Sequence, residues 1–176
     1  DHAQRVLVEY DKLSLKQACL FEQAFAAVGA AEEKGEKLDL LLQELRTIKM
    51  PDEIRKLKEA QKITDDAFTH ILDYIRAGRT EREVALELEF FMRKEGAEGV
   101  SFDFIVVSGK NGSLCHGVPS DKVIEDGDFV TMDTGALLHG YHADMTRTVA
   151  VGHVSDEQRH AYDLVLKAQL DAIAAV

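Results

Sequence analysis

The feature that most constrains this chain is a pair of apolar segments within residues 127–151, separated by His139 and Gly140. Each segment is rich in β-branched and apolar side chains, and a polar residue followed by glycine between two such runs is typical of a β-hairpin. If His139 and Gly140 form a two-residue turn, Leu138 lies opposite Tyr141, and the numbers of paired residues sum to a constant. The sequence therefore predicts one register for the whole hairpin.

In this register Asp133 lies opposite Thr146, and Asp144 lies opposite Gly135. The two aspartates become diagonal neighbours on one face of the hairpin, with roughly 7–8 Å between their backbones. Two carboxylates on one face repel each other, and burying either one unpaired is costly. Either this face is open to solvent, or a cation lies between the carboxylates, as in two-metal hydrolytic sites whose ions are about 3.5–4 Å apart. The spacing by itself favours a solvated face, because aspartate is common near hairpins.

The segments before and after the hairpin carry mostly helical patterns. Apolar residues recur at helical spacing, and the pairs Thr80–Glu83 and Ser155–Gln158 have the residue types of capping boxes. Cys19 falls within the first helical stripe and is expected to be a small core residue. We expect short strands at 5–9 and 102–108, and helices at 14–28, 38–46, 51–78, 80–96 and from 155 towards the end of the chain.

The overall composition is that of a globular protein with a substantial core. Of the 176 residues, 45% are hydrophobic, which is ordinary for a domain of this size. The formal net charge of −11 disfavours a nucleic-acid partner held by phosphate contacts, and no apolar run is long enough to cross a bilayer. The two cysteines, Cys19 and Cys115, lack the spacing of a metal-binding motif and fit a reducing compartment. We therefore expect a cytoplasmic protein with no nucleic-acid or membrane partner.

A loop of small turn-forming residues, 109–121, precedes the hairpin and contains Cys115 and His116. Loops of this length often carry function. Taken singly, His116 is more often a surface histidine than a catalytic one, and Cys115 has no indicated partner that would make it a nucleophile. The remaining polar candidates are expected to be turn, cap or exposed residues: Asp103, Asp121, His139 and His142.

Three sequence blocks occur in order: VSGKNGSLCHGVPSD at 107–121, GDFVTMDTGA at 127–136 and GYHADMTRT at 140–148. Together they resemble the Xaa-Pro aminopeptidase and prolidase family, the pita-bread metallopeptidases related to methionine aminopeptidase and creatinase. The segment LRTIKMPDEI at 45–54 is similar to the family's junction between an amino-terminal and a catalytic domain. The resemblance implies an α+β fold in two parts. Residues 1–48 are expected to close a creatinase-like amino-terminal domain, and residues 49–176 to form the first half of a pita-bread catalytic domain.

The resemblance implies a metal-dependent exopeptidase that hydrolyses the Xaa-Pro bond at peptide amino termini or in dipeptides. In the family, the position of Asp133 chelates one ion, the position of Asp144 bridges two, and the position of His116 contacts the substrate. We expect Thr146, opposite Asp133, to orient a carboxylate. Carboxylate ligands suit Mn²⁺, with Co²⁺ and Zn²⁺ as alternatives. The expected partners are a peptide with proline in second position and a second copy of the chain in a homodimer.

The sequence also departs from the family pattern. One histidine and two glutamates complete the family's metal site, and they belong to a second half that this sequence does not contain. The chain begins with Asp, so we expect a fragment of a longer protein that is inactive by itself. Cys115 stands where proline is common, and Thr134 where an apolar residue is common.

Two other functions are alternatives to the exopeptidase. A non-catalytic binding protein of the same fold is disfavoured because both aspartates and His116 are retained. A creatinase-like hydrolase that needs no metal is disfavoured because it has no use for the aspartate pair.

Overall fold

The computed structural model describes residues 5–9, 12–32 and 37–176. The chain divides into two compact units, residues 1–51 and 52–176. This division lies close to the boundary expected between residues 48 and 49. The assignment of the first unit to a creatinase-like domain stays a prediction.

The residues that the structure describes in the first unit form two helices and one short pair of parallel strands. No residue of its first helix is buried, and Cys19 is exposed, so the prediction of a core cysteine is wrong. A helical stripe shows which face a helix can bury, but burial needs a second surface. In the described part of this unit, the strands are two residues long and offer little area to cover that face. The elements are β1 (Arg5–Val6), α1 (Leu15–Val28), β2 (Ala31–Glu32) and α2 (Lys37–Thr47).

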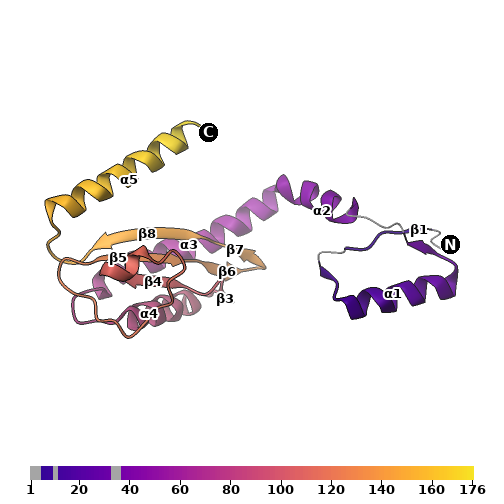
Figure 1. Ribbon diagram of the computed structural model, residues 1–176, viewed down its shortest axis with the longest axis horizontal. Helices are drawn as coiled ribbons and strands as arrows, with labels where there is room; N and C mark the ends of the chain where they lie inside the picture. The colour runs from indigo at the N-terminus through magenta and orange to yellow at the C-terminus, as the bar shows by residue number, and fades with distance from the viewer. Residues whose placement is uncertain (1–4, 10–11, 33–36) are drawn as a thin grey trace. The chain divides into compact units, whose positions relative to one another are not determined.

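Two amphipathic helices line the core of the second unit (Figure 1). Helix α3 (Pro51–Tyr74) starts at the predicted proline but ends before Gly78, the predicted end. Gly78 instead lies in the following turn with a φ of 93° and donates its amide to the carbonyl of Ile124. Helix α4 (Glu81–Lys94) begins at the predicted capping box, in which Thr80 and Glu83 each bind the other's backbone amide.

Six strands form two small antiparallel sheets in this unit, in the orders β3-β6-β7 and β4-β5-β8. The strand predicted at 102–108 is shorter than expected, because only residues from Ile105 onward pair with β5. The elements are β3 (Gly99–Val100), β4 (Ile105–Ser108), the 3-10 helix η2 (Gly109–Ser113), β5 (Phe129–Thr134), β6 (Ala136–Leu138), β7 (Tyr141–His142) and β8 (Met145–Ala150).

The core lies between the two helices and one face of the strands. Alternate residues of β5 are buried, with Val130, Met132 and Thr134 facing inward, as expected for a strand with one buried face. Asp133 lies between two of these inward-facing residues, so its side chain points to the opposite face of β5. The buried apolar cluster comprises Ile63, Ala67, Ile71, Val84, Leu88, Met92, Ala97, Val106, Ile124, Val130, Met132, Ala136 and Val151.

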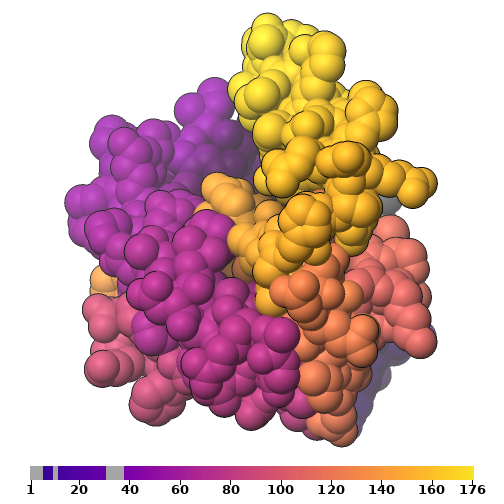
Figure 2. Space-filling model, turned by 90° about the vertical axis from the view of Figure 1, so that its left-hand side faces the viewer, coloured from indigo at the N-terminus to yellow at the C-terminus, as the bar shows by residue number. Residues whose placement is uncertain are grey.

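The last helix, α5 (Asp156–Ala174), begins at the predicted capping box of Ser155 and Gln158, and none of its residues is buried. In Figure 2 its yellow atoms project from the surface rather than pack into it. It contacts the sheet at its base, where the rings of Phe129 and Tyr162 lie 5.8 Å apart. None of the helices in the described part of the chain is both long and apolar enough to span a membrane.

Candidate functional site

The hairpin has the register expected from the sequence. Leu138 pairs with Tyr141, and Asp133 pairs with Thr146. His139 and Gly140 form the turn with φ angles of 54° and 74°. Positive φ at both central residues defines the type I′ turn, whose twist matches that of the flanking strands. The prediction of an exposed turn at His139 is confirmed, and this turn fixes where each aspartate falls along its strand.

A break in the middle of the hairpin lies between the two aspartates. At Gly135 the chain passes from β5, in one sheet, to β6, in the other. A Cβ atom on Gly135 would overlap the carbonyl oxygen of Ala143 on the facing segment, so the two backbones meet here as closely as glycine allows. The amide of Ala136 donates to the hydroxyl of buried Thr64 (3.0 Å), which anchors the break to α3. Asp144 lies on the facing segment, between β7 and β8.

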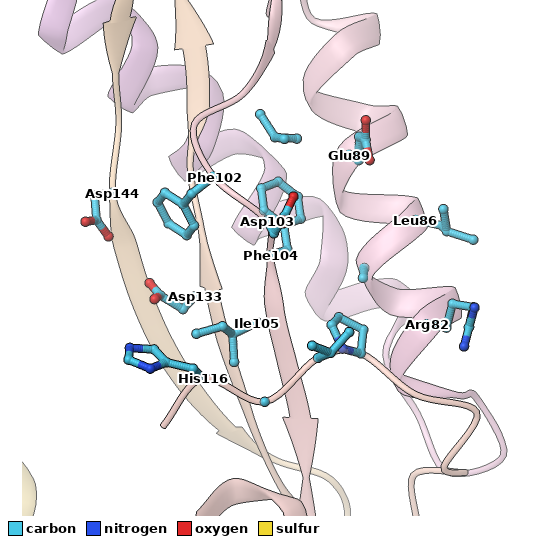
Figure 3. Close-up of a pocket in the computed structure, with 15 residues that line it drawn as sticks. Arg82, Leu86, Glu89, Phe102, Asp103, Phe104, Ile105, His116, Asp133 and Asp144 are labelled. Atoms are coloured by element: carbon cyan, nitrogen blue, oxygen red, sulfur yellow. The ribbon is translucent and has the colours of Figure 1, made fainter. Parts of the chain in front are cut away.

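Both aspartates and His116 line one cleft in the second unit, with a volume of about 760 Å³. Asp133 is half-buried, and Asp144 and His116 are exposed. Figure 3 shows the two carboxylates on neighbouring segments of the hairpin, with the His116 imidazole beside Asp133. The structure therefore brings these three residues together at one side of the cleft.

A hydroxyl holds one of the two carboxylates. Thr146 Oγ1 donates a hydrogen bond of 2.6 Å to Oδ1 of Asp133, across the β5–β8 pair. This distance lies within the range of short hydrogen bonds between a hydroxyl and a carboxylate. It uses one of the several acceptor sites that a carboxylate offers and leaves the others available.

The described residues fit part of a divalent metal site. Carboxylate oxygens are ligands that suit Mn²⁺, and Asp133 and Asp144 present theirs to the same cleft. Within residues 5–9, 12–32 and 37–176, however, no group of three or more His, Cys, Asp or Glu side chains is placed to hold an ion. Two carboxylates fill only part of the coordination sphere of such an ion.

Several residues of the cleft were not expected from the sequence. The sequence predicts a turn or cap residue at Asp103, but Asp103 lines the cleft together with Phe102 and Phe104. The opposite wall comes from α4, including Arg82 and Glu89. The side chain of Arg82 pairs with Asp121 at 3.0 Å. No local pattern marks these positions, because the cleft exists only once α4 lies beside the strands.

Two other polar candidates, His142 and Cys115, are not among the residues that line the cleft. His142 is exposed, and its Nδ1 lies 3.1 Å from the carbonyl oxygen of Ser101. Cys115 is a free, exposed cysteine next to His116 in the chain.

Comparisons with known proteins agree with this fold. The sequence profile of the metallopeptidase family M24 matches residues 55–176. The Xaa-Pro dipeptidase of Pyrococcus furiosus is 44% identical over 139 residues, which are 79% of this chain and 40% of that relative. The solved structure of an Xaa-Pro dipeptidase from Bacillus anthracis is 48% identical, with a TM-score of 0.85 over 95% of this chain and 45% of that one. The X-Pro aminopeptidase from Thermotoga maritima is 41% identical, with a TM-score of 0.85 over 94% of this chain and 46% of that one.

The fold is that of part of a pita-bread metallopeptidase domain, as the sequence predicted. The chain belongs to the metallopeptidase family M24. It spans less than half the length of each of these relatives.

Proposed function

We propose that the protein is a metal-dependent exopeptidase that hydrolyses the Xaa-Pro bond of dipeptides or of peptide amino termini. The observation that carries this proposal is the convergence of Asp133, Asp144 and His116 on one cleft. Relatives named Xaa-Pro dipeptidase and X-Pro aminopeptidase support the choice of substrate.

In this proposal Asp133 and Asp144 hold two divalent ions, of which Mn²⁺ is the preferred choice and Co²⁺ or Zn²⁺ the alternatives. When bound, such ions lower the pKa of a coordinated water and polarise the scissile carbonyl. Thr146 holds the Asp133 carboxylate in one orientation through its 2.6 Å hydrogen bond. His116, exposed at the edge of the cleft, donates a hydrogen bond to the substrate and to the negative charge that develops on its carbonyl oxygen.

We further propose that the 176 residues alone bind the ions weakly and do not hydrolyse peptides. Two carboxylates leave much of a coordination sphere to water, and no third ligand accompanies them in the described part of the chain. The remaining ligands are then supplied by other parts of the protein. Cytoplasmic localisation and a homodimeric state stay predictions from the sequence.

The test compares how fast the full-length protein hydrolyses three matched peptides. Release of the first residue is measured from Ala-Pro, from Ala-Pro-Ala and from Ala-Ala, with Mn²⁺, Co²⁺ or Zn²⁺ supplied in turn. We expect hydrolysis of a proline-containing substrate, loss of hydrolysis with a chelator, and little cleavage of Ala-Ala. The ratio of Ala-Pro to Ala-Pro-Ala turnover assigns dipeptidase or aminopeptidase activity. Equal turnover of Ala-Pro and Ala-Ala would contradict the proposed specificity.

A further inference from the structure

Glu81 is a buried carboxylate that the proposed mechanism does not use. It is the first residue of α4 and has no exposed surface. The capping box of this helix is completed by Glu83, so Glu81 is not needed for capping. A buried charge is costly unless several hydrogen bonds satisfy it. The hydrogen-bond partners of Glu81 therefore indicate its role.

The donors to this carboxylate come from both ends of the loop that carries His116. At the start of the loop, the Ser108 amide (2.7 Å), the Ser108 hydroxyl (3.0 Å) and the Asn111 side-chain amide (3.1 Å) donate to Oε1. After the histidine, the Ser120 hydroxyl (2.6 Å) and the Ser120 amide (3.2 Å) donate to Oε2. One side chain thus closes the loop at its base.

Backbone contacts fasten the far end of the loop to the same turn of α4. The Arg82 amide donates to the carbonyl of Ser120 (3.0 Å), and the Glu81 amide donates to the carbonyl of Lys122 (3.1 Å). The ammonium group of Lys122 donates to the Ser108 hydroxyl (2.9 Å) and pairs with Asp128 (2.8 Å). The base of the loop is therefore one connected polar network.

Between these anchors the hydrogen bonds of the loop are local: the Leu114 amide donates to the carbonyl of Asn111 (2.9 Å), and the Gly117 amide donates to the carbonyl of Leu114 (3.1 Å). Residues 112–116 are exposed. Gly117 is buried, and a Cβ atom there would lie 2.5 Å from Cγ1 of Val107, so the backbone next to His116 touches β4. The backbone at His116 is then placed by the local hydrogen bonds, by the packing of Gly117 against Val107 and by the anchored ends of the loop.

We propose that Glu81 is a positioning residue for His116, acting by tying both ends of the loop 109–121 to the first turn of α4. This inference rests on the proposed function only for the role of His116 in binding substrate. Burial by itself would raise the pKa of Glu81, but hydrogen bonds from Ser120, Ser108 and Asn111 outweigh it, and the pKa lies below its usual value. The carboxylate is therefore ionised at neutral pH and accepts from all its donors.

The first experiment measures hydrolysis of Ala-Pro by the Glu81→Gln variant of the full-length protein. The amide of glutamine turns N–H groups towards the donors of Ser108 or Ser120 and so breaks one anchor. We expect kcat/KM to fall by about 10-fold or more, which is the usual effect of losing a side chain that orients a site residue. The affinity for Mn²⁺ should stay unchanged within about a factor of two. The matched control is Glu83→Gln, on the same helical turn, which keeps a capping-box residue type and should not change kcat/KM.

A double-mutant cycle separates positioning from a general loss of stability. If Glu81 acts through the histidine, Glu81→Gln should add little to the defect of His116→Ala. The proposal would be overturned if the losses of kcat/KM in the two single variants multiply in the double variant. A fall in Mn²⁺ affinity as large as the fall in kcat/KM would also overturn it.

A second measurement does not depend on activity. Lys110 lies exposed within the loop, so the initial rate of tryptic cleavage after Lys110 reports how firmly the loop is held. We expect faster cleavage there in Glu81→Gln and in Ser120→Ala, which removes only the hydroxyl at the far anchor, and no change in Glu83→Gln. Unchanged cleavage in both anchor variants would overturn the proposal. Absence of Ala-Pro hydrolysis by the unmodified protein would instead contradict the proposed function and leave this measurement valid.

Discussion

The hydroxyl of Thr146 donates to Oδ1 of Asp133 across a directly paired position of β5 and β8, at 2.6 Å. Two residues further along β8, Thr148 makes an equivalent cross-strand contact with Thr131 at 2.9 Å. The two pairs are alike in geometry, but only the first ends on a carboxylate of the cleft. This difference allows the role of Thr146 to be tested with a matched control.

Thr146→Val is expected to lower Mn²⁺ affinity, activity, or both by roughly 10–100-fold, because valine keeps the shape but leaves the Asp133 carboxylate free to rotate. Titration calorimetry and Ala-Pro hydrolysis on the full-length protein measure these effects. Thr148→Val removes a hydroxyl from the same strand and should leave both quantities unchanged. Equal effects of the two substitutions would show that the hydroxyl at Thr146 has only a general role in the sheet.

Asp144→Asn is expected to reduce Mn²⁺ affinity and Xaa-Pro hydrolysis by more than Thr146→Val does, because it removes the charge of a proposed ligand rather than the support of one. Asp144 is exposed, so the variant should keep its fold and its unfolding midpoint. The control is Asp121→Asn, which removes an exposed carboxylate that pairs with Arg82 outside the hairpin. Unchanged turnover of Asp144→Asn at saturating Mn²⁺ would refute the metal assignment.

Gly135→Ala is expected to lower the free energy of unfolding by about 1–3 kcal/mol, the usual cost of forcing an extra methyl group into a packed site. The added Cβ would overlap the carbonyl of Ala143, so the facing strand must move, and Asp144 with it. Urea denaturation of the 176-residue chain measures the first effect. Gly112→Ala, where no atom lies within 4 Å of the new Cβ, should cost far less; equal costs at both glycines would contradict the close approach.

His139→Asn is expected to stabilise the protein by up to about 1 kcal/mol. His139 holds a φ of 54°, which is unfavourable for most side chains, whereas Asn-Gly is a preferred pair in type I′ turns. The change lies in the turn and not in the cleft, so activity should stay the same. A lower unfolding midpoint for His139→Asn would show that the histidine contributes contacts that outweigh its backbone cost.

The contribution of Glu81 to stability is expected to depend on pH. Its folded pKa lies below the usual 4.5, so its ionised form stabilises the folded state above pH 4.5. This stabilisation is lost as the pH falls through the folded pKa. At neutral pH, Glu81→Gln should be less stable than the unmodified chain by about 1–3 kcal/mol. Urea denaturation of both chains between pH 3 and 7 should show this gap closing in acid; a constant gap would contradict the assigned shift.

Much of the fold followed from local patterns. The register of the hairpin was predictable because a two-residue turn at His139 fixes the pairing of every residue beyond it. The starts of α4 and α5 were predictable because capping boxes are made by residues three apart. Burial was less predictable. The stripe of α1 suggested that Cys19 is buried, yet no residue of that helix is.

The sequence by itself determined that Asp133 and Asp144 share one face of the hairpin, because strand parity and turn length suffice to place them. Only the tertiary structure decided what surrounds them. Asp103 and Arg82 reach the cleft, and Glu81 holds the His116 loop, because the first turn of α4 packs beside Ser108 and Ser120, which lie 27 and 39 residues from Glu81 in the sequence. Contacts between such distant segments depend on the packing of whole elements, and that packing leaves no mark in the spacing of neighbouring residues.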